Sequence, residues 1–312
     1  MNRVVVACLA LPSLMGCRKA AVTRADTLLV FEAASLAAPM RAILDTFARR
    51  TGTVVLEEHG ASLELARRIT ELHRVPDVIA LADREVFPEV LMPSATTWYA
   101  TFARNRMVVA FTDRSRHASE ITSDNWRDIL LRPDVSVGRT DPVLAPAGYR
   151  ALLSYRLAES FYRDAGLARR LEAKTPNGLI RANAADLAAL LSAGELDYIV
   201  DYESLARAQH LRFIHLPPEV DLGDATQAAH YATAEISVTT PRGVTTRHGA
   251  PILYGISMPT PAPHHDAGLH FLQFLLGAEG KSMLRTAHVD ALDLPSFEGT
   301  GIPAALTVVQ AK

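Results

Sequence analysis

The chain has 312 residues, of which 49% are hydrophobic and 21% charged, and its formal net charge is −2. This length suggests two lobes or domains, since a domain commonly spans about 100 to 200 residues. The near-neutral charge provides no basic field to collect phosphates, which argues against nucleic acid as a partner.

The N-terminus is predicted to be an export signal. Arg3 forms a short positive region and residues 4–15 are largely apolar, a run too short to span a bilayer, which takes about 20 residues, but typical of a signal peptide. The run Leu14-Met15-Gly16-Cys17 resembles a bacterial lipobox. We therefore expect a lipoprotein signal peptide over 1–16, an acylated Cys17 and a tether over 17–26. The alternative is an ordinary secretory signal with a chance cysteine.

The two cysteines, Cys8 and Cys17, both fall in this region. An exported chain would therefore retain no thiol for a disulfide, a zinc–thiolate site or a catalytic nucleophile. No other stretch resembles a membrane span. We expect an exported protein, held by lipid on the outer face of the cytoplasmic membrane.

Short apolar runs then alternate with amphipathic helical patterns. Strands are predicted at 27–31, 53–57 and 77–81, and helices at 36–50 and 63–74. This order is the signature of a parallel, doubly wound α/β sheet.

A second α/β unit begins near residue 107. The pattern predicts strands at 107–111, 135–137, 198–200 and 251–256, and helices at 149–164, 184–191 and 266–276. We interpret the strands near 107–111 and 251–257 as crossovers between lobes. Lobe 1 would then comprise 27–106 plus 251–312, and lobe 2 would comprise 107–250.

Two predicted turns combine small residues with a serine: Ala33-Ala34-Ser35 and Gly60-Ala61-Ser62. Each follows a strand and precedes a helix, which is where open α/β sheets bind ligands. A serine in the capping position beside unpaired helix amides would form an anion site. The alternative is that each serine only caps its helix.

Several runs resemble successive landmarks of one family. They are Ala33-Ala34-Ser35-Leu36, Gly60-Ala61-Ser62, Asp77-Val78-Ile79-Ala80-Leu81-Ala82-Asp83, the run from Ser123 to Asp134, Gly148-Tyr149-Arg150-Ala151-Leu152, Gly194-Glu195-Leu196-Asp197-Tyr198 and the run from Pro251 to Ile256. In this order they resemble the archaeal-type molybdate/tungstate-binding proteins of ABC transporters. The resemblance implies a two-lobed periplasmic-binding-protein fold of the type II kind, which closes over one tetrahedral oxyanion.

The resemblance also implies a ligand set. Ser35 and Ser62, beside Ala34 and Ala61, match the family's hydroxyl ligands from the first lobe. Tyr202 matches its tyrosine ligand from the second, and the turn before Gly148 matches the segment that donates a backbone amide, here at Ala147.

The family's two carboxylate ligands correspond here to Ala145 and Ala184, which cannot coordinate a metal. We therefore expect molybdate or tungstate to be held by hydrogen bonds alone. The alternative is the same fold with a changed ligand, either another oxyanion or a small organic anion.

Acidic residues and a histidine near these turns are candidates for a supporting role: Glu32, His59 and Asp141. Strand alternation places Asp201 and Glu203 on the face opposite Tyr202, so we expect these two to point away from the ligand.

The sequence shows no Gly-x-Ser-x-Gly elbow, phosphate loop or His-Glu-x-x-His motif, so we predict no enzyme activity, no cofactor and no metal site. The pair His264-His265 is interpreted as a solvated helix start. A regulatory ligand-sensing domain is disfavoured by the export signal. We expect a monomer whose partners are the oxyanion and a membrane permease.

Overall fold

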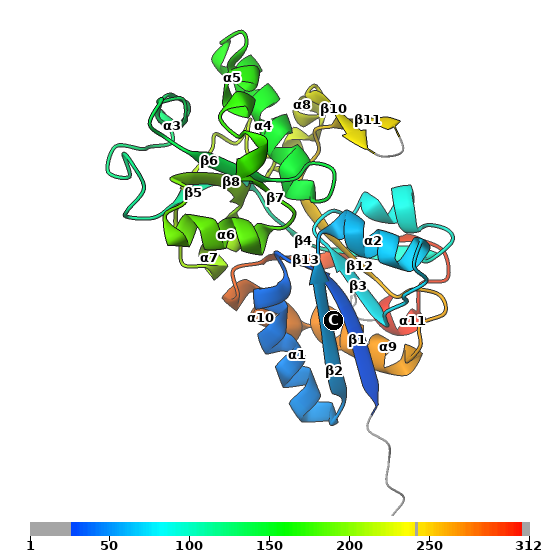
Figure 1. The fold of residues 1–312 in the computed structure, drawn as a ribbon. Helices are drawn as coiled ribbons and strands as arrows, with labels where there is room; N and C mark the ends of the chain where they lie inside the picture. The colour runs from blue at the N-terminus through cyan, green and yellow to red at the C-terminus, as the bar shows by residue number, and fades with distance from the viewer. Residues whose placement is uncertain (1–25, 241–242, 308–312) are drawn as a thin grey trace, which may run out of the picture.

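The computed structural model describes residues 26–240 and 243–307. The predicted signal peptide, Cys17 and nearly all of the tether lie outside the described residues. Two lobes, each built on its own sheet, lie one above the other in Figure 1. This arrangement confirms the predicted two-lobed α/β fold.

The sheet of lobe 1 has the strand order β13-β4-β12-β3-β1-β2. Its strands are β1 (Thr27–Ala33), β2 (Val54–Gly60), β3 (Val78–Leu81), β4 (Trp98–Arg104), β12 (Leu253–Ser257) and β13 (Asp290–Gly299). Strands β1, β2 and β3 are parallel, whereas β12 is antiparallel to β3 and β4, and β13 is antiparallel to β4. The sheet is therefore mixed rather than parallel throughout.

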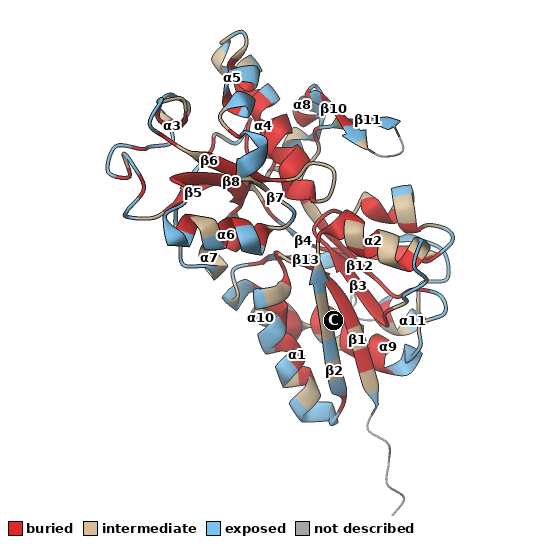
Figure 2. Ribbon diagram, in the orientation of Figure 1, coloured by how far each residue is buried: buried red, intermediate tan, exposed pale blue. Residues whose placement is uncertain are grey.

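Lobe 1 also contains α1 (Ala37–Thr51), α2 (Ser62–Thr70), a π-helical turn at Phe87–Leu91, α9 (His265–Leu276), α10 (Ala278–Thr286) and α11 (Ala304–Thr307). Strand alternation directs Val30 and Phe31 to opposite faces of the sheet. Val30 packs on the face covered by Met40 of α1, and Phe31 packs on the face covered by Leu65 of α2. The central strands are consequently buried on both faces (Figure 2). The predicted helix 63–74 ends earlier, at Thr70, because His73 adopts a left-handed φ of 54°.

The sheet of lobe 2 has the order β7-β6-β8-β5-β9. Its strands are β5 (Met107–Phe111), β6 (Val137–Thr140), β7 (Ile180–Arg181), β8 (Tyr198–Tyr202) and β9 (Arg212–His215). The helices are α3 (Trp126–Leu130), α4 (Pro146–Tyr162), α5 (Leu167–Ala173), α6 (Ala184–Ala193), α7 (Glu203–Ala208) and α8 (Ala228–Tyr231), with 3-10 turns at Asn177–Leu179 and Ala225–Gln227. A hairpin of β10 (Glu235–Thr240) and β11 (Gly243–His248), which the sequence analysis missed, stands apart from both sheets.

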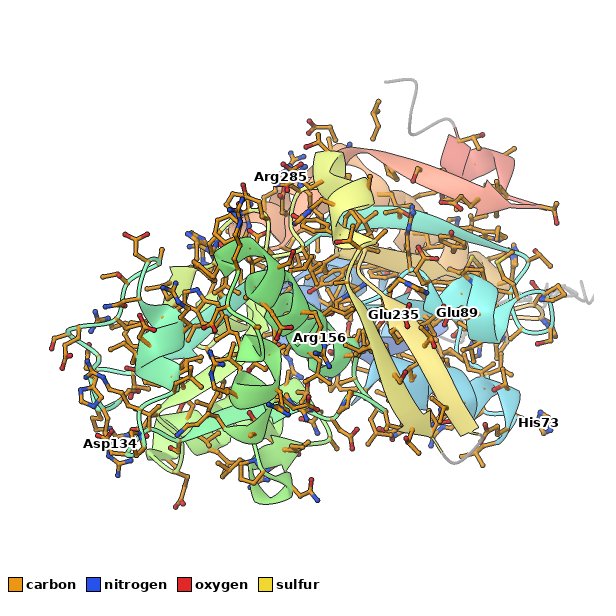
Figure 3. The ribbon with its side chains drawn as sticks, turned by 90° about the horizontal axis from the view of Figure 1, so that it is seen from above. His73, Glu89, Asp134, Arg156, Glu235 and Arg285 are labelled. Carbon is orange, nitrogen blue, oxygen red and sulfur yellow. The ribbon has the colours of Figure 1, made fainter. Side chains whose placement is uncertain are left out.

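This hairpin brings the two lobes into contact. Arg247 of β11 pairs with Glu89 of lobe 1, and its guanidinium lies 5.3 Å from the ring centre of Tyr149 in α4. Figure 3 shows the hairpin passing beside Glu89. Where the chain passes from β4 of lobe 1 to β5 of lobe 2, the buried side-chain amide of Asn105 donates to Ser204 Oγ at 2.7 Å. Among the described residues, no helix is both long and apolar enough to cross a membrane.

Candidate functional site

A small cavity lies between the two lobes, at the carboxyl ends of the strands. It is lined by Ala33, Ala34, Ser35, Gly60, Ala61, Ser62, Ala82, Thr140, Ala145, Pro146, Ala147, Asn183, Ala184, Asp201 and Tyr202. The lining side chains are mostly small, so backbone groups from both lobes can approach a ligand of a few atoms.

Helices α1, α2, α4 and α6 all begin at or beside this cavity. The first four N–H groups of a helix have no partner within the helix, and its N-terminus carries about half a positive charge. Helix ends from both lobes therefore converge on one point with amide donors and positive potential. This arrangement suits an anion, although the chain as a whole is slightly acidic.

The serines lie at the cavity, but neither caps a helix. The N-cap residues are Leu36 for α1 and Ala61 for α2, and neither helix end has a side-chain cap. The predicted capping role is therefore wrong, because Ser35 precedes its cap and Ser62 is the first residue of α2. Ser62 Oγ accepts a hydrogen bond from the Ala82 amide at 3.1 Å, which leaves its own proton free to be donated.

Two further hydroxyls at the cavity have no protein partner within the described part of the chain. Ser35 Oγ and Thr140 Oγ1 are both buried and make no hydrogen bond there. Buried polar groups rarely stay unpaired, so both indicate a polar occupant. Thr140 was not among the site residues predicted from the sequence, whereas its neighbour Asp141 was.

Tyr202 lies at the end of β8, and a buried arginine supports its hydroxyl group. Arg150 of α4 is 4% exposed and donates to Tyr202 Oη at 2.7 Å and to the Ala82 carbonyl at 2.8 Å. Its other terminal nitrogen lies 2.9 Å from Asp83 Oδ1. Burial disfavours the charged guanidinium, but Asp83 and Tyr202 outweigh this effect and hold the pKa of Arg150 above its usual value. Arg150 and Asp83 thus tie the lobes together beneath the cavity.

Asp201 also lines the cavity, so the expectation that it points away is wrong. The cavity lies at the end of β8, where the helices covering both faces of the sheet begin, so alternate residues can both reach it. Asp201 Oδ1 accepts from the Tyr202 amide at 2.7 Å, but Oδ2 has no partner among the described residues. Burial raises the pKa of Asp201 to about 7, against a smaller lowering by the Tyr202 amide.

Ala147, the second residue of α4, lines the cavity. A Cβ atom on Gly148 would meet the Thr140 carbonyl oxygen at 2.4 Å, so α4 approaches β6 more closely than any side chain would allow. Ala145 and Ala184 also line the cavity, at the start of α4 and α6. These are the two positions at which the resemblance implies carboxylates.

The three candidates for a supporting role lie outside the cavity lining. Asp141 accepts from the Val143 amide at 2.7 Å and so holds its own turn. Glu32 is fully buried, and His59 Nδ1 lies 3.0 Å from its Oε1. Burial raises the pKa of Glu32 to about 7, partly offset by His59.

A wider cavity elsewhere is lined partly by arginines, but these are already paired. Arg104 donates to Asp290 at 2.6 Å, Arg207 donates to Glu203 at 2.6 Å, and Arg285 donates to Asp293 at 2.6 Å. Glu203 therefore faces this second cavity, away from Tyr202. Since its cations already have carboxylate partners, the cavity between the lobes is the better candidate for an anion site.

Comparison with known proteins shows which family the chain belongs to. Residues 28–288 match the model of the bacterial extracellular solute-binding protein family. The chain is 38% identical over 281 residues to an uncharacterized solute-binding protein of Petrotoga mobilis, covering 89% of this chain and 87% of that one. It is 34% identical over 296 residues to the molybdate/tungstate-binding protein WtpA of Thermococcus kodakarensis, covering 86% of this chain and 83% of that one.

Among solved structures, the periplasmic molybdate-binding protein of Azotobacter vinelandii aligns with a TM-score of 0.61 at 16% identity, covering 84% of this chain and 98% of that one. The sulfate-binding protein SubI of Mycobacterium tuberculosis aligns with a TM-score of 0.62 at 14% identity, covering 91% and 90%. These likenesses support the two-lobed fold, and the predicted resemblance to molybdate/tungstate-binding proteins is confirmed. The chain belongs to the bacterial extracellular solute-binding protein family.

Proposed function

We propose that this protein binds a tetrahedral oxyanion of the molybdate and tungstate class between its lobes and delivers it to the membrane permease of an ABC importer. The observation that carries the proposal is the convergence of four helix N-termini on a cavity that also holds unpaired hydroxyl groups. A dianion presents only hydrogen-bond acceptors, and this lining is rich in donors.

Tyr202 supplies the best-positioned side-chain donor from lobe 2. Arg150 donates to the Tyr202 oxygen at 2.7 Å, and the hydroxyl group's own proton makes only a long contact of 3.5 Å with the Ala82 carbonyl, so it can turn toward the ligand. A donor polarised by a neighbouring cation makes a stronger hydrogen bond to an anion. Ser35 and Ser62 supply donors from lobe 1.

The coordination chemistry follows from Ala145 and Ala184. Neither methyl group can become a metal ligand, and Asp201, whose pKa is raised to about 7 by burial, acts as a protonated donor, so the oxyanion is held as a four-coordinate ion by N–H and O–H groups. Selection among tetrahedral dianions then rests on size. Molybdate and tungstate, nearly equal in radius, are expected to bind almost equally, and the smaller sulfate to bind more weakly because its hydrogen bonds would be stretched.

The test is calorimetric titration of the purified protein with molybdate, tungstate, sulfate and phosphate. Ser35→Ala and Ser62→Ala each remove a hydrogen bond to a charged group, worth on the order of 1.5–3 kcal/mol, or roughly ten- to a hundred-fold in affinity. Ser154→Ala is the matched control, because Ser154 is a fully buried serine of α4 that does not line the cavity. Failure of all four ions to bind, or unchanged affinity in both serine variants, would contradict the proposal.

One observation favours a second candidate ligand. Asp201 brings an unpaired carboxyl oxygen to the cavity. An ionised carboxylate repels a dianion but accepts a hydrogen bond from a protonated ligand such as hydrogen phosphate. Phosphate binding more tightly than molybdate would establish this alternative.

The proposed setting is the outer face of the cytoplasmic membrane, with anchoring through an acylated Cys17. The support is the lipobox-like run that ends at this cysteine. Cys17→Ala is expected to release the protein from membranes while leaving ligand affinity unchanged. A variant that stays equally membrane-bound would refute the anchor.

A further inference from the structure

Strands β1 and β2 place three metal-ligating side chains on one face of the lobe 1 sheet. The parallel register pairs Glu32 with His59 and Val30 with Glu57. Since strand residues alternate between faces, Glu32, Glu57 and His59 all face the side covered by α1. One ligand atom from each lies within 4.8 Å of the others. Within residues 26–240 and 243–307, no other group of three histidine, cysteine or acidic residues is so close.

Glu32 is the observation that distinguishes this cluster from an ordinary acidic patch. Its side chain is fully buried, and its Oε2 has no hydrogen-bond partner in the described part of the chain, while its Oε1 contacts the imidazole of His59. It is aimed into the cluster, since Oε1 lies 3.0 Å from His59 Nδ1. Glu57 Oε2, also buried and without a hydrogen bond there, lies 3.8 Å from His59 Nε2. Burying ionised carboxylates without a balancing positive charge lowers the stability of the folded protein, and a bound cation would offset this cost.

The protein supplies little positive charge of its own to this cluster. Arg41 of α1 faces it, but its side chain is 63% exposed and its nitrogen stays 3.9 Å from Glu57 Oε2. A contact at that distance and exposure contributes little. The remaining partner, His59, can serve equally as an imidazole ligand. His59 contacts Glu32 in the present structure, but one imidazole faces two carboxylates, so a bound cation would balance the cluster more fully.

We propose that Glu32, Glu57 and His59 bind a divalent transition-metal cation, for which Zn²⁺ is the probe. Two carboxylates and one imidazole suit Zn²⁺, whereas Ca²⁺ and Mg²⁺ require more oxygen ligands. Tetrahedral Zn²⁺ with bonds near 2.0–2.2 Å holds its ligand atoms ~3.3 Å apart. One ligand atom from each of the three residues already lies within 4.8 Å of the others, so side-chain rotations that bring a single nitrogen of His59 and one oxygen of each carboxylate to this spacing complete the site.

The cation would be reached from solvent and would lie beside the cavity between the lobes. The side chains of His59 and Glu57 are 32% and 19% exposed, which provides an entry path on the outer side. Three protein ligands leave a coordination position for water. Ala33 and Gly60, which directly follow Glu32 and His59, line the cavity. The cation site itself does not depend on which anion occupies that cavity.

The test is calorimetric titration of the untagged protein, first stripped of metal by a chelator, with Zn²⁺ in the absence of any oxyanion. We expect one Zn²⁺ per chain, bound at least about ten-fold more weakly by Glu32→Gln and by His59→Gln, because even the loss of a residue that only supports a ligand costs that much. His117→Gln is the matched control. His117 contacts Glu120 at 2.9 Å and Asp134 at 3.0 Å, both on exposed side chains, so its loss is expected to leave the titration unchanged.

Thermal unfolding provides a second readout that shows whether the variants fold. Zn²⁺ is expected to raise the unfolding midpoint of the wild-type protein and of His117→Gln, but not that of Glu32→Gln. Absence of Zn²⁺ binding by the wild type, or equal binding by Glu32→Gln, would overturn the proposal. Failure of molybdate to bind would contradict the proposed function while leaving this result intact, so the two can be judged separately.

Discussion

Arg150 donates a hydrogen bond to the hydroxyl oxygen of Tyr202 at 2.7 Å, and both side chains are almost completely buried. The two residues belong to neighbouring elements of lobe 2, and the arginine also reaches Asp83 of lobe 1. In the proposed function, the tyrosine that donates to the ligand is held by the same cation that joins the lobes.

Tyr202→Phe removes the polarised donor while keeping the ring. We expect oxyanion affinity to fall roughly ten- to a hundred-fold, since one hydrogen bond to a charged group is lost. Calorimetry measures the change. Tyr155→Phe is the control, because Tyr155 is a buried tyrosine of α4 outside the cavity lining and its variant should bind as the wild type does. Equal affinity of Tyr202→Phe and wild type would remove Tyr202 from the site.

Arg150→Met leaves Asp83 buried without its cation. Removing one partner of a buried ion pair costs about 3–5 kcal/mol, so we expect a loss of this order in the free energy of unfolding, measured by denaturant titration. Arg104→Met is the control, because Arg104 and Asp290 are about half exposed and such pairs contribute less than about 1 kcal/mol. Similar losses in both variants would contradict the role assigned to Arg150.

Asp201 predicts a pH dependence of ligand binding. Its pKa is raised by burial to about 7, so below neutrality the carboxyl is protonated and can donate to a dianion. As the pH rises through about 7 it ionises and repels the dianion, so molybdate affinity should fall. Asp201→Asn, which keeps an N–H donor at every pH, should bind without this fall. An identical pH profile in both proteins would place Asp201 out of contact with the ligand.

The raised pKa of Asp201 also makes the free energy of unfolding depend on pH. Because the pKa of Asp201 rises from 3.8 to about 7 on burial, the folded state holds this proton more tightly than the unfolded state. Its contribution to stability is full below pH 3.8 and is lost as the pH rises through about 7. Asp201→Asn should therefore show a smaller loss of unfolding free energy over this range. An equal loss in the variant would show that Asp201 is not its source.

The alternation of apolar strands and amphipathic helices was sufficient to predict the two α/β units, because burial of the sheet faces imposes a regular pattern. The resemblance led to Ser35, Ser62, Ala147 and Tyr202, all of which line the cavity. The capping role of the two serines was mispredicted, because each helix begins one residue away from the predicted boundary. Ser35 precedes the cap of α1, and Ser62 lies inside α2.

Arg150 and Asp201 could not be predicted. A buried charge has no periodic signature, and its partners lie far away in the sequence, as Asp83 does for Arg150. Alternation placed Asp201 and Tyr202 on opposite faces of the strand, but residues from both faces line the cavity. At the end of β8 the cavity lies beyond the sheet and is open to both faces.

X-ray absorption at the molybdenum edge of the molybdate-loaded protein tests most directly whether hydrogen bonds alone hold the oxyanion. With Ala145 and Ala184 at the cavity, we expect four oxygen neighbours in tetrahedral geometry, as in the free ion. Two further oxygen neighbours at bonding distance, supplied by protein carboxylates, would contradict it.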